Sequence, residues 1–178
     1  ALHTLIFDDP ECRPFYYKNG KSFKDYHKEG EIFWHKYVTY TEGMSDYWDY
    51  SFFNVSVIRY ADVLLLYAEC LNDKGETTEA INIINKVRAR VNVPALPLTM
   101  GKAEVLKHLQ DKERPCELAL EGSRWYDLVR WGIVEETLKA HNKPFVENYV
   151  DTKHQLFPIP HSEFLLNPDW EQNPNYSK

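Results

Sequence analysis

The sequence has no long run of basic residues, no long apolar segment and few cysteines. Its 21 Lys+Arg face 27 Asp+Glu, for a formal net charge of −6 at pH 7, which argues against the basic surface that nucleic acid needs. No apolar run approaches the roughly 20 residues of a membrane-spanning helix. We therefore expect no nucleic-acid partner and no membrane span in these residues.

The residues and motifs of most metal and cofactor sites are also missing. The three cysteines, Cys12, Cys70 and Cys116, lie far apart and form no CxxC motif. We expect isolated thiols, because a free cysteine usually behaves as a small buried apolar residue. The seven histidines include no i,i+4 pair, and there is no GxGxxG, P-loop or GxSxG motif. These absences predict no metal site and no cofactor.

What the sequence does contain divides into three segments of one expected domain, residues 1–178. Residues 1–54 are rich in aromatic side chains and turn signals, which predicts loops and short strands. Residues 55–132 carry helical periodicity and are the expected helical core. Residues 133–178 end in Pro/Asn-rich sequence, and we expect an extended tail that docks through Phe157, Ile159, Leu165, Trp170 and Tyr176. The first residue is Ala1, not methionine, so we expect a processed or partial chain.

Two apolar stripes in the core predict a helical hairpin. The first consists of Val63, Leu64, Tyr67, Ala68 and Leu71, and the second of Ala80, Ile81, Ile84, Val87 and Val91. Gly75 and Pro94 are the expected stops. The spacing matches a tetratricopeptide repeat, in which small residues allow two helices to approach closely. A further helix should kink or break near residues 111–115, because Pro115 lies inside it, and a short amphipathic helix should end at Gly132.

Charged residues gather in the last two of these predicted helices and in the segment that joins them. The set is Glu113, Glu117, Glu121, Arg124, Asp127 and Arg130. On one helix the three glutamates would share a face, and paired carboxylates can serve a glycosidase. However, Arg124 with Asp127 and Asp127 with Arg130 are both i,i+3 pairs, and tryptophans lie between them in the sequence. This pattern favours a structural network of partly buried ion pairs. Nearby arginines would also keep the carboxylates ionised, which does not suit a general acid.

An aromatic run in the first segment could bind a ligand. Tyr47, Trp48 and Tyr50 alternate with aspartate and serine. Flat aromatic rings stack on the apolar face of sugars, and polar neighbours can orient the hydroxyl groups. For Phe33, Phe52 and Phe53 we expect packing on the helices instead. Tyr47, Trp48 and Tyr50 are therefore the candidate ligand-binding residues.

In combination, these segments resemble the SusD/RagB family. The resemblance rests on residues 58–69 and 80–90, on Glu113-Arg114 with Glu117-Leu118, on Glu121-Gly122 with Arg124, Asp127-Leu128 and Arg130-Trp131-Gly132, and on the tail motifs Phe157-Pro158-Ile159-Pro160 and Gln172-Asn173-Pro174. Pro115 and Asn175 depart from the family pattern. From the resemblance we expect an N-terminal half with a lipid-anchored cysteine and further repeats, outside these 178 residues.

The resemblance implies a mainly α fold with tetratricopeptide-like hairpins and no catalytic residues. It further implies glycan binding at the outer surface of a Bacteroidetes-type outer membrane, with a SusC-like TonB-dependent transporter as partner. The family's glycan contacts lie in variable loops, so no binding residue is carried over. Two alternatives stay open: a repeat-type scaffold that binds peptides, and a glycosidase built on Glu113, Glu117 and Glu121.

Overall fold

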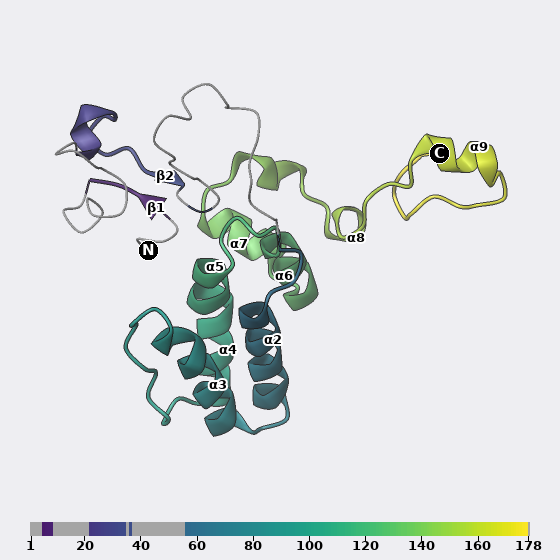
Figure 1. Cartoon of the computed structure of the whole chain (residues 1–178). Coiled ribbons are helices and arrows are strands. Elements are labelled where there is room, and N and C mark those ends of the chain that lie inside the picture. Colours follow the sequence, from purple (N-terminus) through teal and green to yellow (C-terminus); the bar gives the residue numbers. More distant parts are fainter. Residues whose placement is uncertain (1–4, 9–21, 35, 37–55, 178) are drawn as a thin grey trace. The chain divides into compact units, whose positions relative to one another are not determined.

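The computed structural model describes residues 5–8, 22–34, 36 and 56–177, and these are mainly helical, as the sequence predicts. The chain forms two compact units, residues 1–122 and 123–178. Figure 1 shows the elements of each. In the first unit, strand β1 (Leu5–Ile6) pairs antiparallel with β2 (Phe33–Trp34), and a 3-10 turn covers Phe23–Asp25. The short strands of the expected N-terminal segment are thus present.

The predicted hairpin is helix α2 (Tyr60–Asp73) followed by α3 (Thr77–Ala89). Gly75 between them has a φ of +88°, which a residue without a Cβ adopts readily. The small residues Ala68 and Ala80 are fully buried in the core that the two helices share. They leave room for the helices to approach closely, although the full tetratricopeptide arrangement stays a prediction.

The buried face of α2 differs from the predicted stripe. Val63 is 47% exposed and Tyr67 is 51% exposed, whereas Leu65 is completely buried. Helix α2 packs against both α3 and α4 (Lys102–His108). Its buried face is therefore wider than a single stripe and includes Leu65. In the second stripe, Val91 lies beyond the end of α3 and is 37% exposed.

Pro115 changes the form of its helix without breaking it. Helix α4 continues through a π-helical turn, η3 (Leu109–Glu113), into α5 (Arg114–Glu117). A proline has no N–H to donate, and its ring collides with the carbonyl four residues earlier in a regular helix. A π-helical turn is wider than an α-helical one and so accommodates Pro115. The expected disturbance near residues 111–115 is therefore a change of helix type.

The second unit contains four short helical elements and a 3-10 turn. They are α6 (Arg124–Trp131), α7 (Val134–Ala140), η4 (Pro144–Asn148), α8 (Asp151–His154) and α9 (His161–Leu166). Gly132 ends α6 with a φ of +67°, as predicted. Leu128, Val134 and Leu138 form a small core, with Trp125 and Tyr149 packed against it.

The tail differs from the extended, docked segment expected from its prolines. Helices α8 and α9 interrupt it. Of the five predicted docking residues, Phe157, Leu165 and Trp170 are exposed, whereas Ile159 and Tyr176 are half-buried. Polar contacts link separate parts of the tail to one another. Gln172 accepts from the N–H of Ile159 at 2.8 Å and donates to the carbonyl of the same residue at 2.9 Å. One side-chain amide thereby satisfies both polar groups of one residue.

Candidate functional site

Glu121 lies in a charged cluster that joins three distant segments of the first unit. Arg59, directly before α2, donates from Nε to Glu121 Oε2 at 2.6 Å. Lys36, which follows β2, contacts the other carboxylate oxygen of Glu121. The Glu121 side chain is only 7% exposed. A buried carboxylate needs such partners, because burial without them costs several kcal/mol.

The same two cations also hold the end of α5. Lys36 Nζ donates to the backbone carbonyls of Glu117 and Ala119, each at 3.1 Å. Arg59 Nη2 donates to the Glu117 carbonyl at 2.5 Å. The last carbonyls of a helix have no partner within it and carry partial negative charge. Lys36 and Arg59 thus stabilise the helix end as well as the Glu121 carboxylate.

Glu117 bridges two arginines from different helical segments. Its Oε1 accepts from Arg59 Nη1 and from Arg90 Nη2, each at 2.6 Å. Arg90 is the residue directly after α3, and its side chain is 59% exposed. Glu117 therefore connects the start of α2 to the end of α3, and its partner Arg90 is open to solvent.

Glu113, four residues before Glu117, has different partners again. Its Oε2 accepts from Arg88 Nη1 at 2.6 Å and lies 2.8 Å from His108 Nε2. Burial raises the pKa of Glu113, but the hydrogen bonds from His108 and Arg88 outweigh burial and the pKa is lowered. Burial likewise raises the pKa of Glu121, but the hydrogen bonds from Arg59 and Lys36 outweigh burial and that pKa is also lowered. Both groups are held in the ionised form.

The three glutamates do not share one helix face. Glu113 lies in the π-helical turn, Glu117 ends α5, and Glu121 lies beyond the helix, after Leu120 at a φ of +64°. Their partners are Lys36, Arg59, Arg88, Arg90 and His108, none of which belongs to the set named from the sequence. Arg59 and Arg88 stand in the segments that resemble the family, but no local spacing connects them to the glutamates. Carboxylates bound by cations in this way are poor general acids.

The remaining members of the predicted network lie in the second unit. Arg130 Nε donates to Asp127 Oδ1 at 3.0 Å, one of the two i,i+3 pairs expected from the sequence. Asp127 is buried, and the Arg130 guanidinium lies 4.3 Å from the ring centre of Trp131. Arg124 also belongs to α6. Another buried pair was not expected: Arg114 Nη1 lies 2.8 Å from Asp62 Oδ1 in the first unit.

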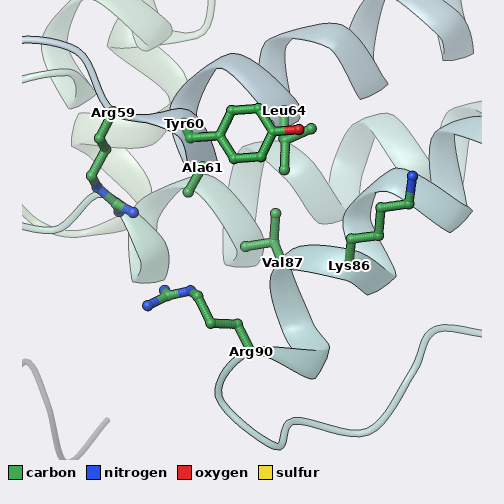
Figure 2. A pocket seen from close by; sticks show the side chains of 7 residues that line it. All are labelled: Arg59, Tyr60, Ala61, Leu64, Lys86, Val87 and Arg90. Atoms are coloured by element: carbon green, nitrogen blue, oxygen red, sulfur yellow. The ribbon is translucent and has the colours of Figure 1, made fainter.

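A pocket of about 380 Å³ opens beside this cluster, between α2 and α3. It is lined by Arg59, Tyr60, Ala61, Leu64, Lys86, Val87 and Arg90. Figure 2 shows the guanidinium groups of Arg59 and Arg90 at one end and the ammonium group of Lys86 at the other. Ala61, Leu64 and Val87 form an apolar floor between these cations.

The ligand candidates Tyr47, Trp48 and Tyr50 lie outside the described residues. Phe33, expected to pack on the helices, is 38% exposed in β2, and its ring centre lies 4.2 Å from that of His27. Phe52 and Phe53, for which the same was expected, lie outside the described residues. Cys70 and Cys116 are free and exposed, not buried as a free cysteine usually is, and Cys12 lies outside the described residues. Among the residues that the structure covers, no three His, Cys, Asp or Glu side chains gather as metal ligands. Within the same residues, no helix has the length and apolarity to cross a bilayer.

Comparison with known proteins identifies the family. The sequence model of the SusD family matches residues 14–176, nearly the whole chain. The chain belongs to the SusD family. SusD-like protein P38 of Formosa agariphila is 35% identical over 132 residues, which are 69% of this chain and 25% of that protein. SusD-like protein P2 of the same organism is 30% identical over 131 residues, 69% of this chain and 26% of its own length.

Solved structures agree with this assignment to the SusD family. A SusD superfamily protein of Bacteroides vulgatus matches 99% of the chain and 39% of its own length, with a TM-score of 0.70 and 28% identity. A SusD homolog of Bacteroides thetaiotaomicron matches 67% of the chain and 26% of its own length, with a TM-score of 0.55 and 35% identity. The chain spans about a quarter of the length of the curated SusD-like relatives.

Proposed function

We propose that this protein binds glycans at the bacterial cell surface without cleaving them, as part of nutrient uptake. The observation that carries the proposal is the match of the SusD family over residues 14–176. The cluster around Glu117 and Glu121 supports a non-enzymatic role, because its carboxylates are occupied by cations. In this proposal Glu113, Glu117, Glu121, Arg124, Asp127 and Arg130 have structural roles.

The proposal includes a location and a partner. Attachment to the outer membrane is through a lipidated cysteine outside these 178 residues, and the bound glycan passes to a SusC-like TonB-dependent transporter. Tyr47, Trp48 and Tyr50 supply a stacking surface for sugar rings. These three assignments follow from the family resemblance and from the sequence pattern. The transporter is tested by co-purification of an affinity-tagged copy from outer membranes, where a TonB-dependent receptor of the same locus is the expected companion.

Calorimetry after a glycan-array screen tests binding. We expect at least one oligosaccharide to bind, and no reducing ends to appear during prolonged incubation. Trp48→Ala should weaken binding severalfold, because one stacking contact is worth about 1 kcal/mol by analogy with aromatic pairs. Trp170→Ala is the matched control, since Trp170 is a half-exposed tryptophan outside the candidate segment.

The outcomes separate the alternatives. Time-dependent release of reducing sugar would establish a glycosidase and overturn the non-enzymatic assignment. Binding that survives replacement of all three aromatic residues would place the sugar site elsewhere. If no glycan binds, and a peptide library yields ligands, the peptide-binding scaffold takes the place of the glycan-binding function.

A further inference from the structure

The pocket between α2 and α3 has an excess of positive charge. Around it, the carboxylates of Glu117 and Glu121 are paired with Lys36, Arg59 and Arg90. Lys86, in the pocket wall, is exposed and has no ion-pair partner among the described residues. The pocket thus presents more cations than its neighbouring carboxylates neutralise. A ligand with anionic groups would balance this charge.

The walls of the pocket suit a ring with one apolar face. Ala61, Leu64 and Val87 form the floor, and the ring of Tyr60, which also lines the pocket, is 75% exposed. The volume of about 380 Å³ is within the range of roughly 300–1,000 Å³ that is usual for small-ligand sites. A sugar ring can place its CH face on such a floor and turn its polar groups outward. A free inorganic anion would leave the apolar floor unused.

The cations stand at both ends of the floor, with Lys86 at one end and Arg90 beside Arg59 at the other (Figure 2). This arrangement fits a ligand that carries more than one anionic group along its length. Acidic oligosaccharides have such groups on successive sugar units. We propose that the pocket binds an acidic oligosaccharide, with anionic groups facing Lys86 and Arg90 and a sugar ring on Leu64 and Val87.

This inference rests on the proposed glycan-binding function and narrows it to acidic glycans. The anionic group is either a uronic-acid carboxylate or a sulfate ester, and both satisfy the chemistry of the pocket. Arg90 and Lys86 are the ligand-facing cations because both are exposed, whereas Arg59 is committed to Glu117 and Glu121. Arg59 acts as a positioning residue, since it holds the carboxylate that orients Arg90.

Titration calorimetry on the full 178-residue chain tests the inference with three probes of equal length. They are tetragalacturonate, a sulfated carrageenan tetrasaccharide and neutral cellotetraose. We expect at least one acidic probe to bind about tenfold more tightly than the neutral one, with a difference that shrinks as salt is added. The double variant Lys86→Ala with Arg90→Ala should bind the acidic probe about tenfold more weakly than wild type, which is the combined effect of losing two exposed ion pairs.

Lys74→Ala is the control, because Lys74 is an exposed lysine at the other end of α2, about 20 Å from Tyr60 along the helix axis. Lys86→Ala alone leaves the ion pairs of Glu117 with Arg59 and Arg90 intact. It replaces the double variant in the test if the double variant unfolds. Acidic probes that bind equally well to Lys86→Ala and to wild type overturn the pocket assignment. Binding of cellotetraose alone overturns the acidic class but leaves the proposed function standing. If none of these probes and no glycan on the array binds, both fail.

Discussion

Arg59 donates from Nε to the Glu121 carboxylate at 2.6 Å, although 62 residues separate them in the sequence. The same guanidinium binds the side chain and the backbone carbonyl of Glu117. One arginine therefore fixes the start of α2, the end of α5 and the loop that follows. Removing Glu121 would leave Lys36 without its carboxylate partner and Arg59 with Glu117 alone, in a largely buried position.

Glu121→Ala is expected to lower the free energy of unfolding by about 3–5 kcal/mol, the usual cost of breaking a buried ion pair from one side. The substitution leaves Lys36 and Arg59 without their shared carboxylate. Urea denaturation measures the change. Glu135→Ala is the control, because its i,i+4 pair with Lys139 is exposed and should be worth under about 0.5 kcal/mol. Equal midpoints for the two variants would mean that the Glu121 pair contributes no more than a surface pair.

Acid should destabilise the protein in a window set by Glu113 and Glu121. The pKa of each is lowered in the folded state from an ordinary value of 4.5, because hydrogen bonds from cations outweigh burial. A depressed pKa stabilises the fold above pH 4.5, and this stabilisation is lost as the pH falls through the lower, folded-state value. Urea midpoints from pH 7 to about pH 3 should therefore fall more steeply in wild type than in Glu113→Gln with Glu121→Gln. Parallel pH profiles would show that other groups cause the acid sensitivity.

Ala68→Leu should push α2 and α3 apart and cost about 1–3 kcal/mol by overpacking. Ala68 is completely buried in the core that contains Ala80 and Ile84. Val63→Leu is the matched control on the same helix, since Val63 is 47% exposed and has room for a larger side chain. Thermal denaturation compares the two. A lower melting temperature for Val63→Leu than for Ala68→Leu would reverse the assignment of the buried face.

Gln172→Ala should free the last residues of the tail from Ile159, which lies earlier in the same tail. The Gln172 amide accepts from the N–H and donates to the carbonyl of Ile159, and it also accepts from the N–H of Asn173. Amide hydrogen exchange at Ile159 should become faster by about tenfold, since a net hydrogen bond contributes about 1 kcal/mol or slightly more. Gln155→Ala is the control, because Gln155 hydrogen-bonds only the exposed Asp151 side chain among the described contacts. Unchanged exchange at Ile159 would show that Gln172 does not protect it.

Local chemistry explains why the helices could be located from the sequence. Gly75 and Gly132 both adopt positive φ at helix ends, and apolar residues at three- and four-residue steps predicted α2, α3 and α6. The Asp127–Arg130 pair could be predicted for the same reason, because i,i+3 neighbours meet on any helix. Likewise Pro115 predicted a disturbed helix, since its missing N–H acts within one turn.

Such local rules could not predict contacts between segments that are distant in the sequence. Nothing in the spacing of Glu121 points to Lys36, which is 85 residues away, or to Arg59. Periodicity also mistook Val63 and Tyr67 for core residues, because the buried face of α2 depends on where α3 and α4 lie. The sequence by itself thus determined the mainly helical fold, the helix ends and the family resemblance, all of which depend on short-range stereochemistry or on motif identity. Only the tertiary structure decided which cation meets which carboxylate and that Arg59, Lys86 and Arg90 line one pocket, because these depend on how the helices pack in space.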